Sequence, residues 1–206
     1  EQTGDRFVLG LGVSHAPMVE GVRGLTYSKP LSTMRAYLEA MDASPFMAKG
    51  PTEDQAAPRL LAALGPRMLE LSASHADGAH PYLTTPEHTA TARSIIGPDK
   101  LLCVEQKVIL TDDAEVAHAT ATAALAIYVT LPNYRNSWLR LGITDEEIDA
   151  NAPSFLDRVI VWGSVDKIRD RVRDHHDAGA DHVCVQALTP GHPHHVDQNA
   201  LRALAP

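Results

Sequence analysis

Five short apolar runs alternate with helical patterns along the chain, and this alternation limits the possible folds more than any other feature. The runs lie at residues 7–13, 59–64, 76–82, 101–110 and 182–188, the third being the weakest. Runs that stay apolar at successive positions are typical of strands buried on both faces of a parallel sheet. The sequence therefore predicts an α/β fold with helices covering the sheet. Five such units fit an open doubly wound sheet or the latter part of a (β/α)8 barrel.

The helical patterns between the runs carry their own start signals, which are Pro30, the Gly65-Pro66 turn, Thr85 before Pro86, and Ser164. We expect Thr111 or Asp112 to cap a further, long helix rich in Ala and Thr. Residues 133–155 read as irregular, apart from a capping box made by Thr144 and Glu147. The pattern thus places every expected strand directly before a helix or a turn.

Length and charge indicate one domain over residues 1–206, in which the Pro- and His-rich residues 189–206 form a loose tail. The net charge of −8 and the pI of about 5.7 argue against binding to nucleic acid or to anionic membranes. No apolar run approaches the ~18 residues that span a bilayer. Cys103 and Cys184 lie within apolar runs, and we interpret them as buried, reduced thiols of a cytoplasmic protein in preference to a disulfide.

Polar residues stand where the predicted strands end, which is where ligands bind in both candidate folds. In chain order these residues are Ser14 and His15, Leu64 to Arg67, His80 to Tyr82, Glu105 to Lys107, and Gln186. A helix that begins at Gly65-Pro66 points free backbone N–H groups at the strand ends, and Arg67 adds a cation, so this turn is a candidate phosphate site. An ordinary strand-to-helix turn with an exposed arginine is the simpler alternative.

The remaining candidates have structural explanations that the residues alone favour. His15 follows Gly10 and Gly12, whose missing side chains would let a flat ring approach the backbone, but His15 and His80 also suit ordinary loop histidines. Glu105 sits in an apolar strand near Lys107, which favours a structural ion pair over a general base. The run His192–His195 lies outside any cluster of Cys or acidic residues, so we expect no metal.

Three segments together resemble a known family. RFVLGLGVSHAP, AALGPRMLELSASHADGAHPYLTTPEHTATAR and VWGSVDKIRDRVRDHHDAGADHVCVQAL are similar to the luciferase-like monooxygenase superfamily, and more narrowly to its actinobacterial branch of deazaflavin (coenzyme F420)-dependent oxidoreductases. The resemblance implies a (β/α)8 barrel that binds flavin or deazaflavin at the carboxyl ends of its strands. It makes the first apolar run the fourth barrel strand, so this chain would supply strands four to eight and lack the first three β/α units.

The resemblance also implies roles for particular residues. The cofactor phosphate would lie at Leu64, Gly65, Pro66 and Arg67, with Thr84 and Thr85 beside it, and Gly12 and His80 would complete the cofactor site. Ser14 and His15 would line the reacting ring and the substrate, with His15 as a proton donor, where a relative such as the sugar-phosphate dehydrogenase has an acid. The resulting expectation is an F420-dependent hydride-transferring oxidoreductase, a homodimer acting on a small molecule. The alternatives are an FMN-dependent monooxygenase and a non-catalytic truncated paralogue.

Overall fold

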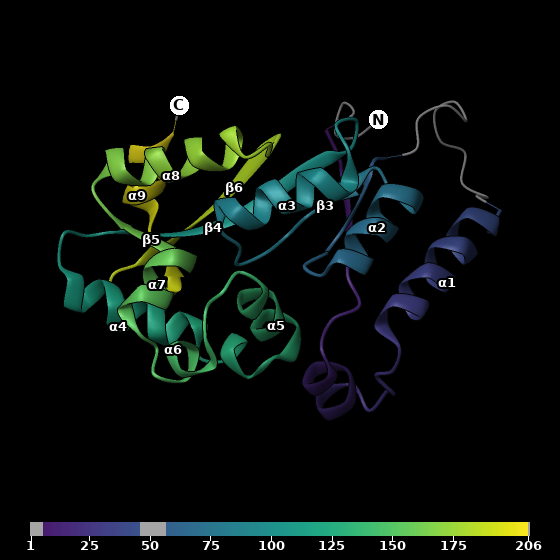
Figure 1. Cartoon of the computed structure of the whole chain (residues 1–206), viewed down its shortest axis with the longest axis horizontal. Coiled ribbons are helices and arrows are strands. Elements are labelled where there is room, and N and C mark those ends of the chain that lie inside the picture. Colours follow the sequence, from purple (N-terminus) through teal and green to yellow (C-terminus); the bar gives the residue numbers. More distant parts are fainter. Residues whose placement is uncertain (1–5, 46–56, 206) are drawn as a thin grey trace.

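The computed structural model describes residues 6–45 and 57–205, which form one mixed α/β unit (Figure 1). The strands are β1 Leu9–Leu11, β2 Arg59–Leu61, β3 Gly78–Ala79, β4 Leu101–Leu110, β5 Ile160–Gly163, β6 His182–Thr189 and β7 His192–Val196. The α-helices are α1 Pro30–Ala43, α2 Pro66–His75, α3 Pro86–Ile96, α4 Ala114–Leu125, α5 Pro132–Arg140, α6 Asp145–Asp149, α7 Pro153–Val159, α8 Val165–Asp177 and α9 Gln198–Leu204. Two short turns complete them, the π-helical η1 Pro17–Val22 and the 3-10 η2 Tyr128–Thr130.

The strands form one sheet in the order β1-β2-β3-β4-β6-β7, with β5 also paired to β4. All pairings are parallel except that of β6 with β7. Among the described residues β1 pairs with β2 alone, and β6 meets β7 only near Leu188 and Thr189, so the ring of strands stays open. Sequential parallel strands with helices outside confirm the expected α/β class and the partial barrel.

The ten-residue strand β4 is the centre of the sheet, because it pairs with β3, β5 and β6. Its even positions face the helices: Val104 packs with residues of α2 and α3, and Val108 packs with Ile168 of α8. Its odd positions, including Glu105 and Lys107, face the barrel interior. This alternation separates Val104 and Val108 from the polar pair Glu105 and Lys107, while Ile109, also at an odd position, packs into the largest apolar cluster.

Helices cover the sheet from several sides. In the view of Figure 1, α4 to α7 gather below the strands, while α8 and α9 lie above them. The largest apolar cluster lies in the lower group, where Trp138 of α5 stacks edge-on against Phe155 of α7 at a ring-centroid distance of 4.9 Å. Both rings are fully buried. The lower helices are therefore held together by a buried apolar cluster.

Several expectations about local structure are confirmed. Thr85 caps α3, and its side chain accepts a hydrogen bond from the His88 N–H. Ser164 caps α8 in the same way through Lys167, and the capping box at Thr144 forms. The strand expected at residues 101–110 has those bounds.

Other expectations are wrong. The segment after Thr189 is no loose tail, because β7 pairs with β6 and Ala200 of α9 is fully buried. The segment 133–155 is helical as α5, α6 and the first part of α7. Asp113 caps α4 in place of Thr111 or Asp112. Both cysteines are free, as expected, but they are only partly buried.

Within the described residues, no helix is long and apolar enough to cross a bilayer.

Candidate functional site

The ends of three neighbouring strands open into one cavity of about 510 Å³. The residues after β1 line it as Gly12 to His15, those after β2 as Ala62 to Gly65, and those after β3 as His80 and Tyr82. The far wall is supplied by α5, through Asn133, Tyr134, Asn136 and Arg140. The cavity thus occupies the position at the carboxyl ends of parallel strands where ligands bind in barrels.

His15 is presented to the cavity by a strained turn. The preceding residue, Ser14, has a left-handed backbone with φ of 61°, which non-glycine residues seldom adopt. The Tyr27 hydroxyl donates a hydrogen bond to the Ser14 carbonyl at 3.2 Å and holds this turn. Backbone strain of this kind is concentrated at functional sites.

The electrostatics of His15 favour its neutral form. Burial lowers the pKa of His15, and a hydrogen bond with the Asn133 side chain opposes that shift only in part. The ring also packs against Tyr134 with a centroid distance of 5.6 Å. The imidazole is therefore neutral at neutral pH. A neutral ring can form hydrogen bonds with a ligand, but it does not bind an anion as a cation would.

The Gly65-Pro66 turn opens α2 toward the same cavity. Gly65 is the N-cap, and its carbonyl accepts the N–H groups of Met68 and Leu69. A Cβ built on Gly65 would meet only Arg140 Nη2, at 3.7 Å, so the turn leaves an open cradle beneath a guanidinium group. The Arg67 backbone N–H and the Arg140 guanidinium are donors that fit the phosphate of a nucleotide-like cofactor.

The expected phosphate partners Thr84 and Thr85 do not line the cavity. Both are almost fully buried, and Thr85 is engaged in capping α3. The Thr84 hydroxyl has no hydrogen-bond partner among the described residues. Of the ten residues predicted for the site, six line the cavity, namely Gly12, Ser14, His15, Leu64, Gly65 and His80, while Pro66, Arg67, Thr84 and Thr85 do not. Their functional roles stay predictions.

Sequence reasoning missed the wall built by α5. This wall comes from the aromatic-polar segment NYRNSWLRLG, which includes Asn133, Tyr134 and Arg140. The composition of the segment does not indicate that it packs beside the strand ends. Tyr134 contacts the rings of Tyr82 and Tyr128 at centroid distances of 6.3 and 5.0 Å. Burial raises the pKa of Tyr134, so it remains a neutral phenol.

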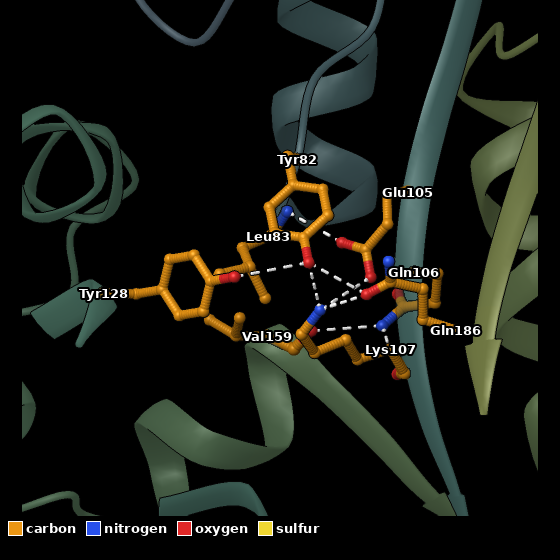
Figure 2. A network of polar contacts seen from close by, with 8 residues as sticks. All are labelled: Tyr82, Leu83, Glu105, Gln106, Lys107, Tyr128, Val159 and Gln186. Atoms are coloured by element: carbon orange, nitrogen blue, oxygen red, sulfur yellow. Dashed lines mark hydrogen bonds and ion pairs between the residues drawn. The ribbon is translucent and has the colours of Figure 1, made fainter. Parts of the chain in front are cut away.

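A polar network reaches from the cavity into the barrel interior (Figure 2). Lys107 Nζ donates to the Tyr82 hydroxyl at 2.6 Å and to Gln186 Oε1. It also forms an ion pair with Glu105 Oε1 at 3.3 Å. The Tyr82 hydroxyl in turn donates to Gln186 Oε1 at 2.9 Å. The predicted ion pair of Glu105 with Lys107 is therefore confirmed, and it proves to be one part of a larger network.

The second oxygen of Glu105 shapes the turn after β3. Glu105 Oε2 accepts the Leu83 N–H at 3.0 Å, while Trp138 Nε1 donates to the Leu83 carbonyl at 3.1 Å. Leu83 has a positive φ of 55°, a left-handed conformation that this residue rarely adopts. Two buried hydrogen bonds thus fix a strained residue directly after Tyr82.

The histidine-rich segment shows no ligand arrangement. His192 and His195 stack in β7 with a centroid distance of 5.6 Å. Over residues 6–45 and 57–205, no three His, Cys, Asp or Glu side chains come together as a potential metal site.

Comparison with known proteins gives concordant matches. The family model for luciferase-like monooxygenases matches residues 1–182. A Mycobacterium tuberculosis protein named as a coenzyme F420-dependent oxidoreductase is 24% identical over an alignment of 246 positions, gaps included, that covers 90% of this chain and 71% of that protein.

Two solved structures share the fold across almost the whole chain. An F420-dependent secondary alcohol dehydrogenase, in complex with an F420-acetone adduct, matches 100% of this chain and 72% of its own with a TM-score of 0.64 and 13% identity. The F420-dependent tetrahydromethanopterin reductase of Methanopyrus kandleri matches 96% of this chain and 72% of its own with a TM-score of 0.61 and 12% identity. At sequence identities this low, the two matches support a shared fold and nothing beyond it.

Proposed function

Because the chain belongs to the luciferase-like monooxygenase family and is an oxidoreductase of that type, we propose that it transfers hydride between F420 and a small organic carbonyl or alcohol. The observation that carries this proposal is the convergence of three strand ends on one cavity. The F420-dependent relative and the alcohol dehydrogenase with its acetone adduct support the choice of cofactor and of substrate class.

The cofactor would bind with its phosphate at the Gly65 cradle. Gly65 offers space, Arg67 offers its backbone N–H in the first turn of α2, and Arg140 offers a cation. Bound there, the deazaflavin would supply the hydride. Ser14 and His15 would line the reacting ring and the substrate, as the lining of the cavity by both residues suggests.

Fluorescence titration of the purified chain with F420 tests this proposal directly. We expect saturable quenching for the wild type and about tenfold weaker binding for Gly65→Leu, a difference of about 1.4 kcal/mol. Gly21→Leu is the matched control, because a Cβ at Gly21 meets nothing within 4 Å and Gly21 does not line the cavity. Equal affinity in all three proteins would remove the phosphate assignment.

The second candidate is an FMN-dependent monooxygenase, which the name of the family favours. A parallel titration with FMN distinguishes the two candidates. Preference for FMN over F420 would replace the F420 assignment, and binding of neither would favour the non-catalytic paralogue. Homodimer formation also stays a proposal, and sedimentation of the same preparation tests it.

A further inference from the structure

We propose that the Tyr82 hydroxyl is the proton donor to the substrate oxygen, with Lys107 as the positioning residue that stabilises the phenolate left behind. This proposal rests on the function proposed above and adds a residue pair that the family resemblance did not point to. Tyr82 lines the cavity, and its hydroxyl lies 2.6 Å from Lys107 Nζ (Figure 2). Among the described residues, Tyr82 is the one that both lines the cavity and accepts a hydrogen bond from that ammonium group.

Lys107 carries a charge that is almost fully buried beside the cavity. Its side chain is 5% exposed, and that of Glu105 is 1% exposed. Burying an ion pair in this way offers little net stability compared with apolar side chains. Lys107 nevertheless lies 4.3 Å from the centroid of the Tyr82 ring, so its charge is directed at the group that faces the cavity.

Glu105 performs a second task in the same arrangement. Its Oε2 accepts the N–H of the strained Leu83, and its Oε1 holds Lys107. A single carboxylate therefore fixes the backbone directly after Tyr82 and the cation beside the Tyr82 hydroxyl. Strained residues held by their surroundings are a common mark of functional positioning.

The titratable groups around Tyr82 keep its proton in place at neutral pH. Burial raises the pKa of Tyr82, the charge of Glu105 on β4 adds to the rise, and hydrogen bonds with Tyr128 and Gln186 oppose it. Tyr134 of α5 and Lys107 of β4 complete the charged and titratable surroundings. The neutral phenol is thus available as an acid, whereas His15 is uncharged and lacks the proton that an imidazolium would give.

The chemistry balances with the named cofactor. Reduced deazaflavin would give a hydride, which carries two electrons, to the carbonyl carbon, and the carbonyl π electron pair would move to oxygen. That oxygen takes the proton of the Tyr82 hydroxyl, so the substrate becomes an alcohol and the cofactor is oxidised. The phenolate oxygen faces the Lys107 ammonium and regains a proton from water on the side of Gln186, which is exposed. Alcohol oxidation runs through the same steps in reverse.

The test compares Tyr82→Phe with Tyr37→Phe in the full chain. Tyr37 is 54% exposed on α1, so its variant makes the same chemical change away from the cavity. With reduced F420 and a panel of small ketones beginning with acetone, we expect kcat of Tyr82→Phe to fall roughly 10²–10⁴-fold, as the loss of a general acid predicts. The affinity for F420 stays within about twofold, and Tyr37→Phe behaves as the wild type.

Two further readouts exclude a purely structural role. Turnover by Tyr82→Ala should be restored in part by added phenol and not by toluene, which fills the same space without an acidic proton. In the protein without cofactor, ultraviolet titration of tyrosinate should lose an ionisation above the ordinary tyrosine pKa in Tyr82→Phe.

The possible failures are distinguishable. A wild type that binds no F420, or reduces no ketone of the panel, overturns the proposed function and this proposal with it. A wild type that binds and turns over while Tyr82→Phe keeps its kcat overturns this proposal alone. If His15→Gln loses the rate instead and Tyr82→Phe does not, the donor is His15.

Discussion

The Glu105 carboxylate holds Leu83 in a left-handed backbone conformation, since Oε2 accepts the Leu83 N–H at 3.0 Å and φ at Leu83 is 55°. The same carboxylate pairs with Lys107 through its other oxygen. One buried side chain therefore joins the turn after β3 to the interior of β4. Burial raises the pKa of Glu105, and the positive charge of Lys107 opposes that rise.

Removal of one member of this pair should cost more stability than removal of both. At pH 8 we expect Lys107→Met to lower the free energy of unfolding by about 3 kcal/mol, because a buried carboxylate is left without its cation. Glu105→Gln/Lys107→Met keeps an acceptor for the Leu83 N–H and should lose about 1 kcal/mol. Urea unfolding of the three proteins measures this. A double variant less stable than the single variant would contradict the prediction.

Gly78 in β3 should tolerate no side chain. A Cβ at this position would lie 2.0 Å from the Leu101 carbonyl oxygen of the neighbouring strand, and backbone cannot move aside without breaking the β3–β4 pairing. We expect Gly78→Ala to lose about 3 kcal/mol of unfolding free energy. Gly10→Ala in β1 is the matched control, since nothing lies within 4 Å of its Cβ, and it should change stability by about 0.5 kcal/mol or less. Similar values for both variants would refute the close approach.

His175 should make the fold sensitive to acid. It is fully buried, with Nε2 donating to Gln106 Oε1 at 3.0 Å and the Thr89 hydroxyl 2.8 Å from Nδ1. Burial, aided by the charge of Arg171, lowers its pKa from 6.5 to about 4. The unfolded chain thus binds a proton below pH 6.5 that the folded chain refuses until about pH 4. Stability should fall across that window by roughly 3 kcal/mol in total.

Urea unfolding at a series of pH values checks this window. His175→Gln should have a shallower loss of stability between pH 6.5 and 4 than the wild type, whatever its stability at neutral pH. His176→Gln is the control, because His176 is exposed on the same helix. Parallel pH profiles for the wild type and His175→Gln would assign the acid sensitivity to other groups.

The two cysteines should react slowly with alkylating reagents. Burial raises the pKa of Cys103 and of Cys184, so each thiol forms less of the reactive thiolate at neutral pH. We expect iodoacetamide to label both at least about tenfold more slowly in the folded protein than in urea. Mass spectrometry of timed samples gives both rates. Equal rates with and without urea would show that the barrel interior gives these thiols no protection.

Much of the fold was predictable because local signals agreed with it. The run at residues 101–110 is apolar on both sides of Glu105 to Lys107, which favours a buried strand, and β4 has those bounds. The strand β5 escaped prediction since it follows α7 without a turn residue between Val159 and Ile160. The strand β7 was missed because Pro and His rarely favour strands, and only its pairing with β6 makes it one.

The sequence predicted site residues only where they stand at the ends of predicted strands. Gly12, Leu64 and His80 lie near the carboxyl ends of predicted strands, and all three line the cavity. The wall from α5 comes from a segment without strand or turn signals, so no local pattern indicated that Tyr134 faces His15. Contacts of this kind depend on tertiary packing, which spacing along the chain does not encode.

The two-sided character of β4 has a consequence for how such a chain can diversify. Its even positions lie against the helix layer and its odd positions project into the interior. Exchanges at every second residue can therefore remodel the reactive lining while the scaffold keeps its packing. Evolution or engineering toward a new substrate can therefore act on the interior-facing positions of β4 and leave its helix-facing positions unchanged.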